Sequence, residues 1–272
     1  MGEMTMREVQ LVALDILKIV ANICEENGFR YLLAYGTLLG AIRHKGFIPW
    51  DDDIDILMPR PDYEKFVAYF LTHKKELYPL RLFNMDTCPQ YPYMITRISD
   101  DRYRLKVANE KEYGMGIFID IYVLDGIGNT AEDAYRLLKK TCKYPRLIFL
   151  STRNHYHFGT TKGFLKRLIK FPVFFYAKLM GKKYFVNKLL CLIDKDTYDK
   201  SLYVACPIWD NRPTWGMRKS IIDNLIKVPF EDHFFYAPKD YDSFLNIFYG
   251  NYMELPPAKD RIYHHLYKAY KR

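Results

Sequence analysis

The sequence predicts an α/β fold, with helices packed on a mixed sheet, and three segments carry this prediction. Residues 31–34 (YLLA) form a short apolar run that leads into a Gly-Thr pair and a helical stretch at 38–44. Residues 54–58 continue an alternating acidic run, and residues 116–124 (GIFIDIYVL) are almost wholly apolar. Apolar strands interleaved with helical stretches are typical of α/β proteins. The chain has 272 residues, 49% of them hydrophobic, so it can bury a substantial core.

An amphipathic helix is expected before these segments. Its apolar residues recur at helical spacing and share one face, namely Val9, Val12, Ile16, Ile19 and Ile23. Gly28 is expected to end the helix, because glycine adopts the left-handed conformation of a C-cap without strain. Polar residues interrupt the stretch, so we expect neither a signal peptide nor a membrane span here.

The remaining elements follow in order along the chain. Strands are expected at residues 31–34, 54–58, 80–83, 93–98, 104–108 and 117–124. A Pro-Arg-Pro-Asp turn at 59–62 is expected to start a helix at 63–71, because proline and aspartate are both favoured in a first helical turn. The predicted regions are an N-terminal helix and core at 1–130, a basic helical insertion at 131–200, and a C-terminal region at 201–272. The last region is expected to pack on the core and to contain a helix at 240–248.

The acidic run IPWDDDIDI at 48–56 is the most informative motif. Asp51, Asp53 and Asp55 occupy alternate positions, so in an extended chain their carboxylates face the same way. Like charges on one face repel unless a cation lies among them or water screens them. Ligand sets made only of oxygen suit Mg²⁺ or Mn²⁺. An isolated D-x-D is more often a solvated acidic turn, so the flanking residues decide between the two interpretations.

Two flanking features favour a metal site. Gly36 and Thr37 stand at a strand-to-helix junction, where free backbone N–H groups and a hydroxyl form a phosphate cradle. Asp120 lies in the middle of an apolar run, where an ionised carboxylate is costly without a partner. A metal is a natural partner for it. The alternative is that Asp125 is the exposed member and Asp120 is hydrogen-bonded only to backbone.

Residues 33–66 resemble the LicD family, whose bacterial members transfer phosphocholine from CDP-choline to cell-surface glycans and whose animal relatives are the fukutin-type transferases. The matching string is LAYGTLLGAIRHKGFIPWDDDIDILMPRPDYEKF, and the resemblance continues through GIFIDIYVLDG at 116–126 and YDSFLNIFYGNYMELPP at 241–257. It is weaker in the middle of the chain. The W-D-D-D-I-D core together with R-H-x-G-F-I-P is far more specific than a bare D-x-D. Asn251 departs from the family pattern, which more often has Asp there, and is given no role.

The resemblance implies a core similar to the nucleotidyltransferase superfamily. It also implies transfer of phosphocholine to a hydroxyl of a cell-surface glycan precursor, of teichoic acid or lipopolysaccharide type, with release of CMP. Asp53 and Asp55 would hold Mg²⁺ (or Mn²⁺) against the diphosphate of CDP-choline. Asp120 would share a second metal or take the proton of the acceptor hydroxyl. Asp51 would be either a direct ligand or a carboxylate outside the ligand shell.

Further residues are expected to bind the donor, and they are Gly36, Thr37, Arg43, His44, Lys45 and Trp50. The Gly-Thr pair would receive phosphate oxygens at the helix N-terminus. The Arg-His-Lys triplet would complement phosphates, unless it forms an exposed basic loop. Trp50 would wall the site or stack on a base, unless it is a core aromatic residue.

The quaternary ammonium of choline calls for an aromatic cage. The chain contains 24 Tyr, 18 Phe and 3 Trp, so aromatic residues are abundant. Tyr93, Trp209 and Trp215 are candidates, although packing in the core or on the surface explains such residues more often. Choline is therefore inferred from the resemblance and the aromatic content together.

The charge of the chain is uneven. Residues 134–193 carry fourteen Lys or Arg and no Asp or Glu, and because the whole chain is +9 the remainder is −5. Within this segment, residues 162–179 sort into a basic helical side, with Lys162, Lys166, Arg167 and Lys170, and an apolar side, with Phe164, Leu165, Leu168, Ile169, Phe171 and Phe175. This pattern predicts a helix on an anionic membrane, kinked or interrupted at Pro172, that serves a lipid-linked glycan acceptor. The alternative is a solvated basic face packed on the core. Nucleic acid is disfavoured as a partner, because no nucleic-acid motif accompanies the patch.

The five cysteines are odd in number and form no C-x-x-C pair, which argues against a disulfide framework and a structural zinc site. We therefore expect a cytoplasmic protein, peripheral on the inner face of the bacterial plasma membrane. Competing functions are transfer of ribitol or glycerol phosphate from its CDP donor, and nucleotidyl transfer from an NTP with release of pyrophosphate. A non-catalytic binding protein is disfavoured by the intact set of acidic residues.

Overall fold

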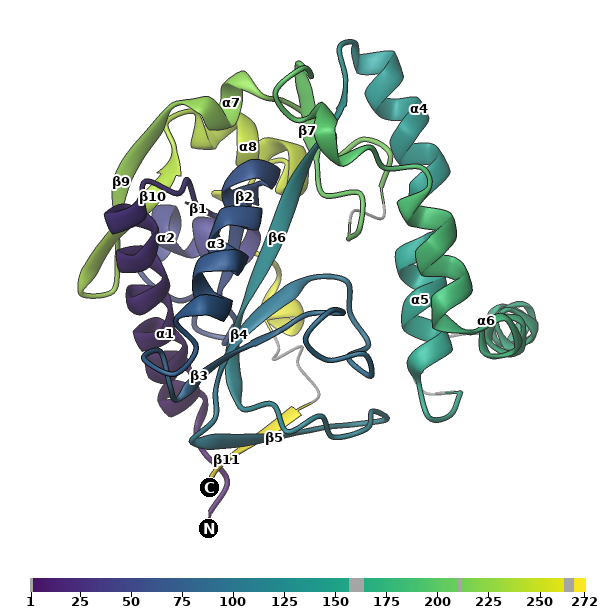
Figure 1. Ribbon diagram of the computed structural model, residues 1–272, viewed down its shortest axis with the longest axis horizontal. Helices are drawn as coiled ribbons and strands as arrows, with labels where there is room; N and C mark the ends of the chain where they lie inside the picture. The colour runs from purple at the N-terminus through teal and green to yellow at the C-terminus, as the bar shows by residue number, and fades with distance from the viewer. Residues whose placement is uncertain (1, 157–163, 210–211, 262–266) are drawn as a thin grey trace.

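A mixed sheet forms the centre of the computed structural model, which describes residues 2–156, 164–209, 212–261 and 267–272. In these residues the sheet has seven strands; its path is β1-β2-β6-β4-β3, with β7 paired to β6 and β8 to β7 (Figure 1). Strands β2 and β6 are parallel, and the other pairs are antiparallel. The predicted α/β class with a mixed sheet is confirmed.

The strands of this sheet are β1 (Leu32–Leu33), β2 (Asp55–Pro59), β3 (Leu80–Phe83), β4 (Thr96–Asp100), β6 (Ile117–Gly128), β7 (Tyr203–Ala205) and β8 (Met217–Arg218). Two further antiparallel pairs join β9 (Leu225–Phe230) to β10 (His233–Pro238), and β5 (Tyr103–Val107) to β11 (Tyr267–Lys271). The helices are α1 (Met6–Asn27), α2 (Tyr35–His44), α3 (Arg60–Thr72), α4 (Ala131–Thr141), α5 (Tyr144–Thr152), α6 (Phe164–Leu190), α7 (Ser220–Asp223) and α8 (Tyr241–Tyr249).

Helices α1 and α3 pack against β6 and its neighbouring strands, whereas α4, α5 and α6 stand together at the other side of the view (Figure 1). Strand β6 is buried along nearly its whole length, as its apolar sequence predicts. A separate small apolar cluster joins α4 to the far end of β6, and it contains Ile127, Ala134, Leu138 and Ala205. The segments at the two ends of the chain also meet, because Glu3 and Tyr270 form a β-bridge.

Helix α1 begins and ends as local chemistry requires. The Thr5 side chain and Glu8 form a capping box at its start, and Gly28 ends it with a left-handed φ of 67°, as predicted. The predicted apolar face is displaced, however. Ile19 is 41% exposed, whereas Leu17 and Val20 are fully buried. The buried face of the helix is therefore rotated from the predicted one, so that it includes Leu17 and Val20 and leaves Ile19 at its edge.

The acidic run is only partly extended, so the condition under which its three carboxylates would face the same way is not met. Residues 51–54 lie outside any strand, and β2 begins at Asp55. The backbone N–H of Asp51 donates to the Ile48 carbonyl at 2.9 Å, which closes a turn. The side chain of Gln10 donates to the Asp51 carbonyl at 2.7 Å and fixes that turn against α1. The three carboxylates are therefore not set on one face of a single strand.

Helix α6 also differs from its prediction. It continues through Pro172 without interruption, and its non-helical residue is Gly181, with φ 74° and ψ 162°. Glycine is the residue that tolerates this left-handed φ without strain. No described helix is both long and apolar enough to cross a membrane.

Candidate active site

Three charged residues form one row across the centre of the sheet. Asp55 on β2 is in register with Asp120 on β6, and Asp120 is in register with Arg97 on β4. Paired residues on adjacent strands project to the same face, so their side chains are neighbours. The parallel pairing of β2 with β6 therefore brings together two of the aspartates predicted as site residues.

Arg97 is the partner of Asp120. Its Nε donates to Oδ1 of Asp120 at 2.6 Å, and its Nη2 lies 3.4 Å from Oδ2. Both side chains are buried, with 10% and 6% exposed. Burial alone would lower the pKa of Arg97, but the charge of Asp120 reverses this and holds it well above its usual value. The bond from Arg97 contradicts the alternative in which Asp120 is hydrogen-bonded only to backbone, and Asp125 is fully buried rather than exposed. The metal partner expected for Asp120 stays a prediction.

A cavity of about 200 Å³ opens beside this row. It is lined by Asp53, Tyr93, Arg97, Val107, Ala108, Glu110, Phe118, Asp120, Phe149, Arg153 and Tyr267. We call it the acidic-row cavity. Two predicted site residues, Asp53 and Asp120, share it, and they come from the loop before β2 and from the middle of β6. Sequence reasoning missed its arginines, because each comes from a distant segment.

Two aromatic rings lie against the guanidinium group of Arg97. Its guanidinium carbon lies 4.3 Å from the centre of the Tyr93 ring and 3.8 Å from that of Phe118. The Tyr93 hydroxyl also donates to the Glu110 carboxylate. Tyr93 therefore contacts an arginine in this structure, where an aromatic cage would require its face for choline.

The electrostatic effect of the aspartates converges on Tyr122. This tyrosine lies on β6 and is only 4% exposed. Burial raises its pKa well above the usual value, and the charges of Asp55, Asp120 and Asp53 raise it further. The three residues predicted to be catalytic thus lie close enough to act on one side chain.

A second cavity, of about 310 Å³, contains other predicted donor-binding residues. Gly36, Arg43, Trp50 and Asp51 line it, together with Tyr249 and neighbouring residues of the C-terminal region. A Cβ atom added to Gly36 would lie 2.8 Å from Oδ2 of Asp51. Only glycine allows the carboxylate this close to the first turn of α2. Asp51 and Asp53 therefore line different cavities, although they are nearly adjacent in sequence.

Thr37 is buried and bonded to the backbone of the site, whereas a phosphate-binding residue was expected there. It is 3% exposed, and its hydroxyl oxygen accepts a hydrogen bond from the backbone N–H of Asp55 at 2.8 Å. This contact joins the first turn of α2 to the start of β2. Thr37 fixes the backbone that carries Asp55.

The three basic residues at the C-terminal end of α2 have different roles. Arg43 donates to the Tyr252 carbonyl at 2.7 Å and through Nε to Nε2 of His44 at 3.0 Å. Burial lowers the pKa of His44, and the charge of Arg43 lowers it further, so the imidazole is an uncharged acceptor at neutral pH. Lys45 is exposed, with a left-handed φ of 61°, and lines neither cavity. Only Arg43 of the three has its charge beside a cavity.

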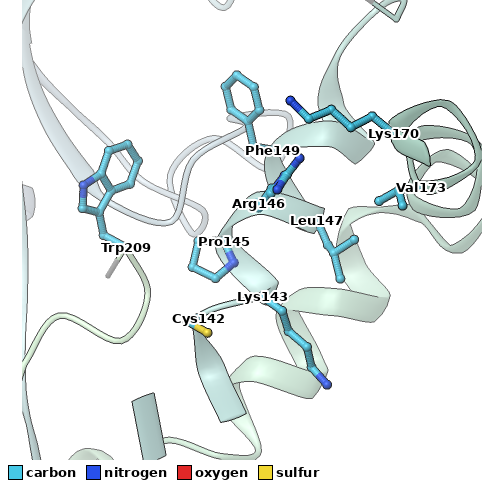
Figure 2. A pocket seen from close by; sticks show the side chains of 9 residues that line it. All are labelled: Cys142, Lys143, Pro145, Arg146, Leu147, Phe149, Lys170, Val173 and Trp209. Atoms are coloured by element: carbon cyan, nitrogen blue, oxygen red, sulfur yellow. The ribbon is translucent and has the colours of Figure 1, made fainter. Parts of the chain in front are cut away.

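A third cavity, of about 640 Å³, lies between α5, α6 and Trp209. Figure 2 shows Trp209 facing α5 across it, with the side chain of Lys170 extending toward Phe149. Phe149 lines this cavity and the acidic-row cavity, so the two share a wall. The surface is mainly apolar, but Lys143, Arg146 and Lys170 add positive charge.

The three predicted cage residues do not meet. Tyr93 lines the acidic-row cavity, Trp209 lines the third cavity and packs on Tyr122, and Trp215 packs on Phe248. The structure places the three candidates in different surroundings, and a choline-cage role for any one of them stays a prediction. Aromatic abundance identified no position, because most of these rings fill the core.

The predicted membrane-facing cations are only partly visible. Lys162 lies outside the described residues, as do the side chains of Lys166 and Arg167. Lys170 lines the third cavity.

The acidic residues fit a hard cation in kind, because carboxylate oxygens are the ligands that Mg²⁺ prefers. Asp53 and Asp55 supply such oxygens, whereas Arg97 holds both oxygens of Asp120. Among the described residues, no group of three or more His, Cys, Asp or Glu side chains is arranged to hold a metal ion. A metal at this row would therefore need further oxygens, which a bound diphosphate carries.

Comparison with known proteins gives a consistent result. Residues 28–146 match a family model described as LicD/FKTN/FKRP, nucleotidyltransferase domain. The chain is 33% identical over 281 residues to the lipopolysaccharide cholinephosphotransferase LicD of Haemophilus influenzae, covering 99% of both chains. Shorter matches, 46% identical over 42 residues, occur with uncharacterized proteins of Rickettsia prowazekii and Rickettsia typhi. They cover 15% of this chain, and 16% and 14% of those proteins.

Proposed function

This chain belongs to the LicD family, and we propose that it transfers phosphocholine from CDP-choline to a hydroxyl group of a lipopolysaccharide glycan. The observation that carries this proposal is the full-length similarity to a protein named as a lipopolysaccharide cholinephosphotransferase. The row of Asp55, Asp120 and Arg97, with Asp53 in the adjoining cavity, supports it as a place for phosphate chemistry.

In the proposed reaction, the acceptor oxygen attacks the β-phosphorus of CDP-choline. A bond forms between that oxygen and phosphorus, the bond from phosphorus to the CMP oxygen breaks, and the acceptor proton passes to a carboxylate of the site. Arg97 donates to both oxygens of Asp120, so this carboxylate is already engaged before substrate binds. We therefore propose that Asp120 positions Arg97 and that Asp53 contacts the substrate.

We further propose Mg²⁺ as cofactor, held by Asp53 and Asp55 and by the donor diphosphate. The metal would neutralise negative charge as CMP departs. Calorimetric titration of Mn²⁺ in the presence of CDP-choline measures this directly. Asp53→Asn and Asp55→Asn should each weaken Mn²⁺ binding strongly, whereas Asp223→Asn, remote from the row, should not. Equal binding by all variants would refute the ligand assignment.

An exposed apolar stripe supports peripheral contact with a membrane. Phe171, Phe175 and Leu179 recur at intervals of four on α6, and they are 41%, 53% and 85% exposed. Side chains at this spacing share one helical face. An apolar stripe on a strongly basic segment is typical of helices that lie on anionic lipid. We propose that this face holds the protein beside a lipid-linked glycan acceptor.

Flotation with anionic liposomes tests the membrane contact. Phe175→Ser with Leu179→Ser should reduce the bound fraction severalfold. The control is Leu202→Ser, because Leu202 is 62% exposed but lies outside α6, directly before β7. Unchanged flotation of the α6 variant would exclude the stripe as the contact.

Thermal unfolding with different donors tests the proposed substrate. CDP-choline at about a hundred times its dissociation constant should add about 2.7 kcal/mol, a shift of several degrees for a chain of this size. CDP-ribitol, CDP-glycerol and CTP should give smaller shifts, and Asp53→Asn should lose the metal-dependent part. Preferential stabilisation by CDP-ribitol or CDP-glycerol would indicate that ribitol phosphate or glycerol phosphate, rather than phosphocholine, is the transferred group. A response to CTP alone would favour nucleotidyl transfer.

A further inference from the structure

Arg153 is a buried arginine in which two of the three guanidinium nitrogens have no hydrogen-bond acceptor among the described residues. It follows α5, and its side chain is 8% exposed. Its Nη1 lies 2.5 Å from Oε1 of Glu110, and its guanidinium carbon lies 4.0 Å from the centre of the Phe149 ring. Its Nε and Nη2 have no hydrogen-bond acceptor in the described part of the chain. Buried donors in this state are rare, because each has lost its water without a replacement.

The unused atoms form one edge of the guanidinium group. The same edge is occupied in Arg60, whose Nε and Nη2 donate to the two oxygens of Asp125 at 2.7 and 2.8 Å. This side-on arrangement is the one by which arginine binds carboxylate and phosphate with two parallel hydrogen bonds. Arg153 therefore presents the geometry for an oxyanion that the described part of the chain does not supply.

The surroundings of Arg153 hold it in a fixed place. Its carbonyl accepts a hydrogen bond from Nζ of Lys178 on α6 at 2.8 Å. The next residue, Asn154, donates through its backbone to the Asn109 carbonyl at 3.3 Å. The guanidinium is thus set by α5, α6 and the loop after β5 before any ligand arrives, which lowers the ordering cost of binding.

Arg153 lines the acidic-row cavity, together with Arg97, Asp53, Glu110 and Asp120. Two positive and three negative side chains therefore face one space. A simple anion is disfavoured there, because the carboxylates repel it. A zwitterion fits better, since its oxyanion can meet arginine while its cation lies nearer to the carboxylates. Phosphocholine has this charge arrangement.

We propose that the Nε and Nη2 edge of Arg153 binds the phosphate of the phosphocholine group while it is transferred. This inference rests on the proposed function and names the residue that binds the transferred phosphate. Arg153 lies beyond the residues 28–146 that match the family model, so the helical region after the core contributes it. The two hydrogen bonds would replace the acceptors that the buried guanidinium now lacks.

Calorimetric titration with CDP-choline, without any acceptor glycan, tests this assignment. Arg153→Lys keeps the charge but removes the side-on pair, and it should weaken CDP-choline binding about tenfold or more. Arg136→Lys is the matched control, since Arg136 lies on α4 with its side chain 60% exposed, and its binding should be unchanged. A second variant, Glu110→Gln with Arg153→Gln, avoids a lone buried carboxylate and should show the same loss while it remains folded.

Further probes distinguish a phosphate of the donor from a phosphate of the acceptor, and they distinguish the role of Arg153 from the choline proposal. Phosphocholine alone should bind more tightly to the wild-type protein than inorganic phosphate does, because its cation meets the carboxylates of the cavity, and Arg153→Lys should weaken the binding of both probes. Unchanged donor binding with a raised KM for the acceptor would place a phosphate of the acceptor at Arg153 and overturn the assignment. If the wild-type protein prefers CDP-ribitol, the choline proposal fails, yet Arg153→Lys should still weaken that donor. Equal affinity of Arg153→Lys and wild type for every CDP-alcohol would refute the role of Arg153.

Discussion

Asp120 and Asp125 lie five residues apart on β6, and each is paired with a buried arginine, yet their surroundings differ. Asp125 is fully buried, and Arg60 occupies both of its oxygens at 2.7 and 2.8 Å. Asp120 pairs less evenly with Arg97, is in register with Asp55, and lines a cavity. An odd separation along a strand places the two carboxylates on opposite faces.

This difference separates a structural ion pair from one in a site. Both pairs are costly to bury, so burial and charge alone do not identify function. The pair of Arg60 and Asp125 joins α3 to β6, and neither residue is among those that line the acidic-row cavity. The Arg97 pair adjoins further carboxylates and open space. Position beside a cavity, with a second acidic residue in register, is the distinguishing observation.

Breaking either pair should give the largest effect on stability. Asp125→Leu leaves Arg60 buried without its partner, and Asp120→Leu does the same to Arg97. Each should lower the free energy of unfolding by about 3–5 kcal/mol. Chemical denaturation measures this, and a loss below about 1 kcal/mol in either variant would show that its arginine finds water or another acceptor.

Replacing whole pairs should then distinguish their roles. Arg60→Met with Asp125→Leu should recover much of the stability and retain phosphocholine transfer, because apolar replacement of a buried pair is often neutral. Arg97→Met with Asp120→Leu should recover stability but lose about 10²–10³-fold in kcat, the usual range for one lost electrostatic contact to a transition state. Similar activity in both double variants would remove the distinction.

A smaller effect is expected at the contact that positions Asp55. Thr37→Val removes the acceptor of the Asp55 backbone N–H, which should cost about 1–3 kcal/mol of unfolding free energy. It should also lower kcat, because Asp55 loses its fixed place at the start of β2. Thr37→Ser preserves the oxygen and serves as the control. Full activity in Thr37→Val would separate this contact from the site.

The smallest effect on stability among these ion pairs is expected for Arg7 and Glu231, which are partly exposed. The hydrogen bond from Arg7 lowers the pKa of Glu231 from its ordinary value of 4.5. A lowered carboxylate pKa stabilises the fold above the unfolded-state pKa, and this contribution is lost as the pH falls through the folded-state pKa. Glu231→Gln should therefore destabilise by at most about 1 kcal/mol at pH 7. The difference from wild type should disappear in acid unfolding experiments; a difference that grows on acidification would contradict the assignment.

Local patterns predicted the elements that local chemistry determines. The apolar run at 116–124 predicted β6, the Gly28 cap ended α1, and the turn before α3 predicted that helix, although it begins at Arg60 rather than at 63. The same patterns placed Asp53 and Asp120, which share a cavity. These features depend on residues that are close in sequence.

The remaining parts of the site depend on distant pairing. Arg97 reaches Asp120 only because β4 pairs antiparallel with β6, and no spacing rule in the sequence gives that register. Arg153 arrives from the end of α5, in a segment interpreted for its charge alone. Asp51 was expected to face the same way as Asp53 in an extended run. Instead, the hydrogen bond from its backbone N–H to the Ile48 carbonyl closes a turn, and Asp51 lines another cavity.

The most direct measurement combines the purified protein, Mg²⁺, CDP-choline labelled in its choline group, and lipopolysaccharide that lacks phosphocholine. Labelled lipopolysaccharide and CMP should appear in equal amounts, and Asp53→Asn should yield neither. Release of pyrophosphate from CTP without labelling of the glycan, or full transfer by Asp53→Asn, would contradict the proposed function.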